Sequence, residues 1–340
     1  MRRTWSFGVT VASILLLAAV SPASSASART GASHAPSTAS SGRIREFSVP
    51  TASSSPEGIT LGPDGAMWFT EFAADKIGRV TTAGQVTEFP LPRPDSFPLG
   101  ITAGPDGNLW FTEIESPDRI GRMTPSGQVT EFRLPSPRGD PAGITAGPDG
   151  NLWFTEQTAN KIGRITPAGV FTEFPLPQPL RAPTDITVGP DGALWFTENQ
   201  WIGRMTTAGQ LTEFPVPTTS SGPDGITTGP DGNLWFTEYD RMNGGKIGRL
   251  TPAGSFTEFP LTDRGSEPVG IAAGRDGNLW FDEAIGNNIG RITTTGTITE
   301  RPIPTANSYP FGVATGPNGT VWFTEIFGNA VGAVAPRPAG

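Results

Sequence analysis

The residues of this chain best suited to acid–base chemistry are carboxylates at fixed places in a repeated motif. A glutamate closes the phrase WFTE, or a close variant of it, seven times: Glu71, Glu113, Glu156, Glu198, Glu238, Glu283 and Glu325. A second position follows the proline of the phrase PxGI and changes from copy to copy: Glu57, Leu99, Ala142, Thr184, Asp224, Val269 and Phe311. A constant residue serves the repeat itself, whereas a variable residue is free to serve one site. The variable position therefore marks the candidate site.

The constant glutamates have a candidate partner in the phrase IGR. Six repeats supply its arginine: Arg79, Arg122, Arg164, Arg204, Arg249 and Arg291. We predict an ion pair between glutamate and arginine in each of these repeats. The seventh repeat reads Val331-Gly332-Ala333, so Glu325 lacks that arginine and becomes the candidate catalytic residue.

The elements that position these residues follow from the repeat length. Seven tryptophans recur at intervals of 40 to 45 residues, which is the length of a propeller blade: Trp68, Trp110, Trp153, Trp195, Trp235, Trp280 and Trp322. One repeat reads GITLGPDGAMWFTE, a short loop, KIGRVTTAG and QVTEFPLP, with turn glycines between short β-branched and aromatic runs. This pattern predicts four antiparallel strands per repeat. The expected fold is an all-β, seven-bladed β-propeller.

The ends of the chain predict how the ring closes. The phrase TEFP, or a variant of it, follows each of the first six tryptophans, but no copy follows Trp322. The missing strand occurs at the other end, as Arg45-Glu46-Phe47-Ser48-Val49-Pro50. We expect this segment to complete the last blade and leave no free inner edge.

Two constant side chains have structural explanations. We expect the tryptophans to pack between neighbouring blades. The aspartates of the GPDG turns, such as Asp64, are expected to bond to their own backbone, because each turn offers too few oxygens for a calcium loop.

In such a blade the first strand begins, and the second ends, at the same face. The residues after the prolines and the strand-end glutamates should therefore surround one mouth of the central channel, where propellers bind ligands. We assign a substrate-binding site to Glu57, Leu99, Asp224, Val269, Tyr309 and Phe311. The expected occupant is a small molecule or a cyclic peptide.

Composition and the N-terminus restrict partners and location. Arg2 and Arg3, an apolar run and the small residues up to Ala28 are typical of a secretory signal peptide, so we expect secretion after cleavage near Ala28. Residues 29–42 form an expected linker, 43–336 the propeller and 337–340 a tail. The formal charge of −8 and the lack of a basic stripe argue against nucleic acid and membrane partners. The chain has no cysteine, so packing and closure must stabilise what we expect to be a monomer.

The phrases PxGIT, GPDGxLWFTE, NKIGR and TEFPLP, repeated seven times over about residues 43–335, resemble the virginiamycin B lyase family of seven-bladed propellers. The resemblance implies a magnesium-assisted elimination that opens a cyclic depsipeptide at its ester, with histidine as the base. The two family histidines correspond to Val269 and Phe311, the seventh-blade magnesium carboxylate to Tyr309, and a first-blade tyrosine to Glu57. Glu325 matches a family carboxylate, and we assign Glu325 and Glu267 as candidate magnesium ligands. The chain's sole histidine is His34, in the expected linker.

Three functions follow from these residues. The first is a carbon–oxygen lyase with a carboxylate base such as Glu325 or Glu57, whose pKa burial must raise. The second is a propeller that binds a ligand or a protein at the mouth without turnover. The third is a metal-dependent lactonase that uses Glu57, Asp185 and Asp224.

Overall fold

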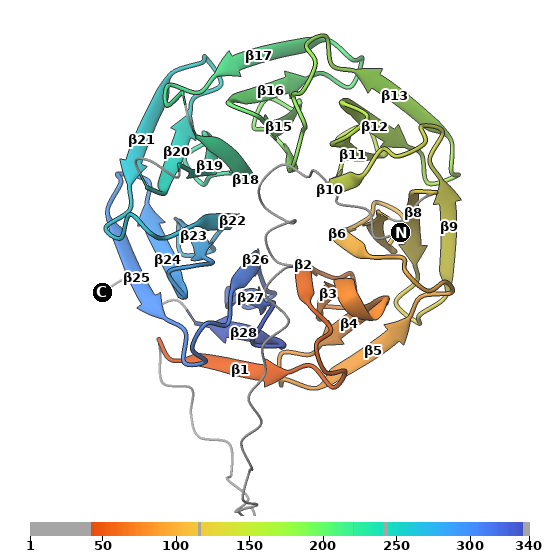
Figure 1. The fold of residues 1–340 in the computed structure, drawn as a ribbon, viewed down its shortest axis with the longest axis horizontal. Helices are drawn as coiled ribbons and strands as arrows, with labels where there is room; N and C mark the ends of the chain where they lie inside the picture. The colour runs from red at the N-terminus through yellow and green to blue at the C-terminus, as the bar shows by residue number, and fades with distance from the viewer. Residues whose placement is uncertain (1–41, 115–116, 220, 241–243, 336–340) are drawn as a thin grey trace, which may run out of the picture. The chain divides into compact units, whose positions relative to one another are not determined.

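The computed structural model describes residues 42–114, 117–219, 221–240 and 244–335, which form a ring of seven blades around a central axis (Figure 1). The predicted all-β propeller is confirmed. The expected signal peptide, His34 and the tail at 337–340 lie outside the described residues. Within the described ranges, no helix has the length and apolar character to cross a membrane.

Each described blade is an antiparallel sheet of four strands that follow one another outward from the channel. Blade 1 contains β2 (Pro56–Leu61), β3 (Met67–Glu71), β4 (Lys76–Val80) and β5 (Val86–Pro90), with a 3₁₀ turn, η1 (Phe72–Ala74), after β3. Blade 2 contains β6 (Pro98–Ala103), β7 (Leu109–Glu113), β8 (Arg119–Met123) and β9 (Val129–Arg133). Blade 3 contains β10 (Pro141–Ala146), β11 (Leu152–Glu156), β12 (Lys161–Ile165) and β13 (Phe171–Pro175).

The remaining blades repeat this order. Blade 4 contains β14 (Ile186–Val188), β15 (Leu194–Glu198), β16 (Trp201–Met205) and β17 (Leu211–Pro215). Blade 5 contains β18 (Gly222–Thr228), β19 (Leu234–Tyr239), β20 (Lys246–Leu250) and β21 (Phe256–Pro260). Blade 6 contains β22 (Pro268–Ala273), β23 (Asn278–Glu283), β24 (Asn288–Thr293) and β25 (Ile298–Pro302). Blade 7 contains β26 (Pro310–Thr315), β27 (Val321–Glu325), β28 (Ala330–Val334) and the N-terminal β1 (Ile44–Ser48).

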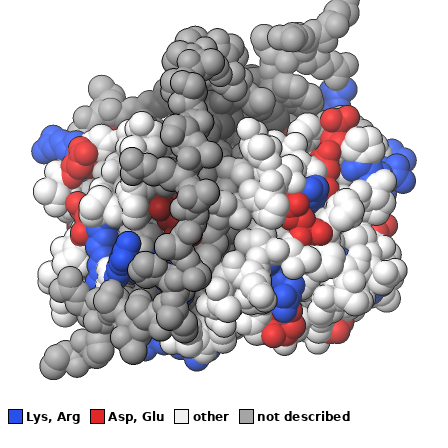
Figure 2. Space-filling view, turned by 90° about the horizontal axis from the view of Figure 1, so that it is seen from below, with Lys and Arg blue, Asp and Glu red and all other residues white. Residues whose placement is uncertain are grey.

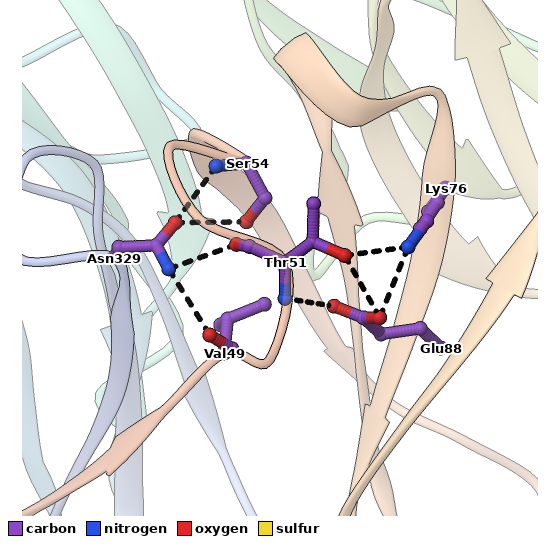
Figure 3. Close-up of polar contacts among 6 residues, drawn as sticks. All are labelled: Val49, Thr51, Ser54, Lys76, Glu88 and Asn329. Carbon is purple, nitrogen blue, oxygen red and sulfur yellow. Dashed lines mark hydrogen bonds and ion pairs between the residues drawn. The ribbon is translucent and has the colours of Figure 1, made fainter.

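The ring closes through β1, as the sequence predicts. This strand runs antiparallel to β28 from Ile44, opposite Val334, to Ser48, opposite Ala330. Asn329 then fixes the loop that leads to blade 1, because its Nδ2 donates to the carbonyls of Val49 and Thr51 and its Oδ1 accepts from the backbone and hydroxyl of Ser54 (Figure 3). Segments about 280 residues apart in the sequence are joined here.

The glycine of the IGR phrase is explained by the packing inside each blade. The ring of Phe69 lies over Gly78 of the neighbouring strand, where a Cβ would approach the ring to 2.1 Å. The same phenylalanine–glycine pair occurs in the other six blades. A side chain at this glycine would displace the aromatic ring from the core.

The tryptophans fill the layer between blades, which confirms their predicted role. Trp68 is fully buried with Leu109 and Phe111 of the next blade. Its indole Nε1 donates to Oδ1 of Asp64, which also accepts from its own turn at the Ala66 amide. Because truncation of such a side chain to alanine costs about 3–5 kcal/mol, these contacts explain why the tryptophan is constant.

Candidate functional site

The residues after the prolines and the strand-end glutamates lie at the same end of the blades. Pro56 is opposite Glu71 in blade 1, and the corresponding proline and glutamate pair in blades 2, 3, 5, 6 and 7. A register shift follows each of these prolines, so the residue after it leaves the ladder. The predicted mouth is therefore built from these irregular strand starts (Figure 1).

A threonine bridge links the mouth from blade to blade. Thr70 of the WFTE phrase accepts a hydrogen bond from Gly58 and donates one to the Leu99 carbonyl of the next blade, at 2.8 Å. Five further threonines make the same two bonds: Thr112, Thr155, Thr197, Thr237 and Thr324. In every blade except blade 4 a glycine follows the mouth residue and lies against the next blade; at Gly58 a Cβ would reach the Leu99 carbonyl oxygen at 2.3 Å.

Blade 6 breaks this pattern with Asp282, which our sequence analysis missed although WFDE replaces WFTE. The side chain is fully buried. Its Oδ1 accepts from the amides of Val269 and Gly270, at 3.1 and 3.2 Å. Burial raises the pKa of Asp282 well above its ordinary value, and nearby Asp224 and Glu283 raise it further. A protonated carboxyl group has the O–H donor that threonine supplies in the other blades.

Asp185 breaks the pattern in blade 4, where it replaces the glycine. Its Oδ2 accepts from the Ile226 amide of blade 5 at 2.9 Å, and its Oδ1 accepts from the Ile186 amide at 2.8 Å. Burial raises its pKa to about 6, and these two amides oppose that rise. Asp185 thus forms a bridge between two blades, which leaves few lone pairs for the metal-binding role considered in the sequence analysis.

Acidic and phenolic groups of blades 5 to 7 gather on one side of the mouth. Burial raises the pKa of Asp224 to about 7, with Asp185 and Glu267 adding to the rise. Burial also raises the pKa of Tyr309, and the charges of Glu267, Asp282 and Asp224 contribute. The structure therefore brings together the predicted residues Asp224, Glu267 and Tyr309 and adds Asp282.

Glu57 is a separate acid at the mouth. It is 4% exposed, and its Oε2 has no hydrogen-bond partner among the described residues. Burial raises its pKa to about 8, while Ser55 opposes the rise. Glu57 is therefore mostly protonated at neutral pH in the absence of a positive partner.

Apolar groups complete the mouth. Leu99 and Phe311 are partly exposed, whereas Val269 is buried. Tyr309 packs against Phe327, whose side chain is 54% exposed, with 5.1 Å between ring centroids. Aromatic faces beside carboxyl groups suit a ligand that is partly apolar and partly polar.

The predicted ion pair between strand-end glutamate and IGR arginine is wrong. In the register Arg79 lies opposite Trp68, three positions away from the pair formed by Glu71 and Lys76. Arg79 instead bonds to Asp64 at the opposite end of the blade, at 2.6 Å. Arg122, Arg164, Arg204 and Arg291 also pair with the aspartates of their turns. The loss of an IGR arginine therefore does not distinguish Glu325 from the other glutamates.

The strand-end glutamates instead face a second glutamate on the outermost strand. Glu71 lies beside Glu88, and burial followed by the charge of Glu88 raises the pKa of Glu71 to about 8. Glu325 has a similar acidic neighbour: it is fully buried beside Glu46 and Ser308, and burial and Glu46 raise its pKa to about 8, although Ala330 stands where blade 1 has Lys76. The assignment of Glu325 as the catalytic residue stays a prediction, and its environment matches that of a repeated structural pair.

The described acids fit a bound magnesium ion poorly. Among these residues, no three histidine, cysteine, aspartate or glutamate side chains are placed to share one metal ion. Glu325 lies with Glu46 and Ser308, whereas Glu267 lies with Asp224 and Tyr309. Mg²⁺ requires a near-octahedral set of oxygens, and these two neighbourhoods do not supply one. We therefore derive no step through a metal.

Charged side chains on the outer wall form small areas of mixed sign. In the side view of Figure 2, basic and acidic side chains adjoin one another, and no broad area of one sign is visible in that view.

Comparison with known proteins identifies the family to which this propeller belongs. The virginiamycin B lyase family model matches residues 27–201 and 180–339. The chain belongs to this family.

Solved structures agree with this classification. A streptogramin B lyase is 40% identical, with a TM-score of 0.81 over 86% of this chain and 96% of the other. A catalytically inactive histidine-to-alanine variant of virginiamycin B lyase from Staphylococcus aureus, solved with quinupristin, is 41% identical, with a TM-score of 0.80 over 86% and 98% of the two chains. A gluconolactonase-like protein shares only the fold, at 17% identity and a TM-score of 0.52 over 86% and 91%.

Proposed function

We propose that this protein binds a compact ligand with an apolar ring and a basic group at the channel mouth, and that binding, rather than imidazole-dependent elimination, is its function. A cyclic peptide lactone is the class that its family indicates. The observation that carries the proposal is the mouth itself, where acids stand beside Phe311, Tyr309 and Leu99, and where none of the described residues is a histidine.

The acids favour a cationic partner. The negative charges of Asp185 and Glu267 contribute to the raised pKa of Asp224. A bound cation would relieve this repulsion between the acids. Glu57 offers a buried oxygen without a partner on the blade 1 side. A cation in the mouth favours ionised carboxylates, so its affinity should increase as the pH rises through about 7, where Asp224 titrates.

The loss of imidazole argues against the family reaction. The variant lyase solved with quinupristin is described as catalytically inactive after one histidine is replaced. In this chain the corresponding family positions carry Val269 and Phe311, neither of which accepts a proton. This supports a propeller that retains the binding surface of the family without its base.

A slow elimination through a carboxylate base is the second candidate function. Its support is Asp224, whose pKa of about 7 is near the optimum for a general base at neutral pH. In that reaction the Asp224 carboxylate removes a proton from a carbon next to a carbonyl group. A carbon–carbon double bond forms as the bond between the β-carbon and the ester oxygen breaks, and the ring opens with release of a carboxylate.

One experiment separates these functions. We would incubate the full chain with a streptogramin B, with and without magnesium, and measure binding by calorimetry and the product by mass spectrometry. We expect binding without a product, at least about tenfold weaker in Asp224→Asn, because a charged hydrogen bond contributes about 1.5–3 kcal/mol. Asp95→Asn, an equal charge change in an exposed loop, is the control and should bind normally.

The other outcomes are distinct. Ring opening at unchanged mass, lost in Asp224→Asn, would establish the carboxylate lyase and overturn the binding function. Addition of one water would indicate a hydrolase. The absence of both binding and product would contradict the proposed ligand class.

We also propose that the chain is secreted after cleavage near Ala28 and acts as a monomer. The apolar run after Arg2 and Arg3 supports secretion. The intact mass of protein recovered from the culture medium checks the cleavage site.

A further inference from the structure

Blade 7 lacks a side chain that blades 1, 3 and 5 share. The residue opposite the strand-end glutamate is Lys76 in blade 1, and Lys161 and Lys246 hold this position in blades 3 and 5. In blade 7 the same register places Ala330 opposite Glu325.

The lysine ammonium groups occupy a defined site. Nζ of Lys76 lies 2.5 Å from the Thr51 hydroxyl and 3.0 Å from Oε2 of Glu88, as Figure 3 shows. Lys161 contacts Ser136 and Glu173 in the same way, and Lys246 contacts Thr218 and Glu258. Each ammonium therefore joins the outer glutamate to a hydroxyl of the loop that precedes its blade.

Blade 7 keeps the acceptors of this site. The Thr305 amide donates to Oε1 of Glu46 at 2.9 Å, just as the Thr51 amide donates to Oε1 of Glu88 at 2.8 Å. Glu325 is fully buried behind them, as the strand-end glutamate is in every blade, and Glu46 and Ser308 lie beside it. Within the same residues, no lysine or arginine pairs with Glu46 or Glu325.

The other blades supply an N–H donor by different means. Arg93 bonds to Glu131 in blade 2 at 2.8 Å, and Arg181 bonds to Glu213 in blade 4 at 2.9 Å. In blade 6, Nδ2 of Asn288 donates to Glu283 at 3.1 Å. Among the described residues, blade 7 is thus the one in which no side-chain N–H group donates to the paired glutamates.

We propose that blade 7 contains a binding site for an unbranched primary alkylammonium ion, formed by Glu46, Glu325 and Thr305. The three N–H donors of the ammonium match the three acceptor groups, and its alkyl chain takes the path of the missing lysine side chain over Ala330. Two carboxyl groups and one hydroxyl suit this organic cation better than a divalent metal, which needs more oxygens. The site lies in the outer half of the blade and does not depend on the function proposed for the mouth.

Thermal unfolding of the full chain in n-butylammonium chloride tests the site, at constant ionic strength, with tetramethylammonium and sodium chlorides as controls. We expect a saturable rise in melting temperature with butylammonium alone, because a ligand that binds the folded state stabilises it. Glu46→Gln should weaken the apparent affinity at least about tenfold, through loss of a charged hydrogen bond.

Two matched variants should change the response to butylammonium in opposite directions. Ala330→Lys should remove the response by filling the site with its own ammonium group. Lys76→Ala should add a second responsive site in blade 1. An equal rise with sodium or tetramethylammonium, or an unchanged response in Glu46→Gln, would overturn the proposal. A Lys76→Ala protein that responds no more than the unmodified chain would also contradict it.

Discussion

Asp282 occupies a position at which six other blades carry a threonine. Threonine both accepts from its own blade and donates to the next one, whereas an ionised aspartate only accepts. Burial therefore raises the pKa of Asp282 and favours its protonated form, so the contribution of Asp282 to stability depends on pH. Its carboxyl group interacts electrostatically with Asp224 and Tyr309 at the mouth.

Replacement of Asp282 by threonine should stabilise the protein, by about 1–2 kcal/mol near neutral pH. The pKa of Asp282 is higher in the folded state than in the unfolded state. As the pH rises above the unfolded-state pKa, only the unfolded state releases the proton, so the free energy of unfolding decreases. The gain in melting temperature should therefore be larger at pH 8 than at pH 4. Thr237→Asp, the reverse change in blade 5, should be destabilising with the same pH trend. An equal gain at both pH values would show that Asp282 does not titrate in this range.

At the scale of elements, blade 7 differs from the other blades in its assembly and in several side chains. It is assembled from both ends of the propeller. Its β28 carries Ala333 in place of the arginine of the other six blades, and Ala330 where blades 1, 3 and 5 carry lysine. Its turn has Asn318 in place of the aspartate, and Nε1 of Trp322 has no hydrogen-bond partner within the described residues. The junction of blades 7 and 1 nevertheless buries Trp322 with Met67 and Phe69.

Asn318→Asp should restore the missing bond of Trp322. The corresponding aspartates accept from their indoles at 2.9 to 3.2 Å, and a net hydrogen bond contributes about 0.5–1.5 kcal/mol. We expect a rise in melting temperature of about 2–4 °C by calorimetry. Asn318→Ala is the control, because it removes the bond to the Thr320 amide and supplies no acceptor, and it should lower the melting temperature. A variant with aspartate that melts no higher than the original chain would refute this account.

At the scale of the whole molecule, the ring contains a buried carboxyl group paired with a second glutamate in every blade. Burial comes first and the neighbouring glutamate adds to it: the pKa rises to about 8 for Glu71, Glu113, Glu156, Glu198 and Glu325, to about 7 for Glu238, and also upward for Glu283. Because every blade contains such a pair, the fold as a whole favours the protonated form of these strand-end glutamates.

Global stability should consequently decrease between about pH 5 and pH 8. In this range the unfolded glutamates are ionised while the folded ones still hold protons, so stability declines with rising pH and levels off above the folded pKa values. Below about pH 4 the turn aspartates act in the opposite direction, because their pKa values are lowered: hydrogen bonds from Trp68 and Arg79 outweigh the effect of burial on Asp64. Thermal unfolding should show a maximum near pH 4–5 and a melting temperature lower by at least about 5 °C at pH 8. Glu71→Gln should reduce that slope; a flat profile would contradict the paired-acid account.

Much of the fold could be predicted from the sequence because propeller repeats are local. Each blade is made from consecutive residues, so the period of the tryptophans, the turn glycines and the missing TEFP copy were enough to predict seven sheets and closure by the N-terminal strand. The mouth could be predicted for the same reason, since the register of β2 and β3 follows from one hairpin.

The partners of charged side chains required the tertiary structure. Glu71 and Arg79 share a hairpin, yet the strands place them at opposite ends of the blade, and the real partner of Glu71 is Glu88 on the outermost strand. Contacts between blades could not be predicted from the sequence either, because the residues involved are far apart in the chain. Asp185 accepts a hydrogen bond from Ile226, and Thr324 donates one to the Glu57 carbonyl. The sequence by itself determined the repeat, its strands and its closure through short-range patterns. The packing of one blade against the next decided which carboxyl groups meet, because these distances depend on the ring rather than on any single repeat.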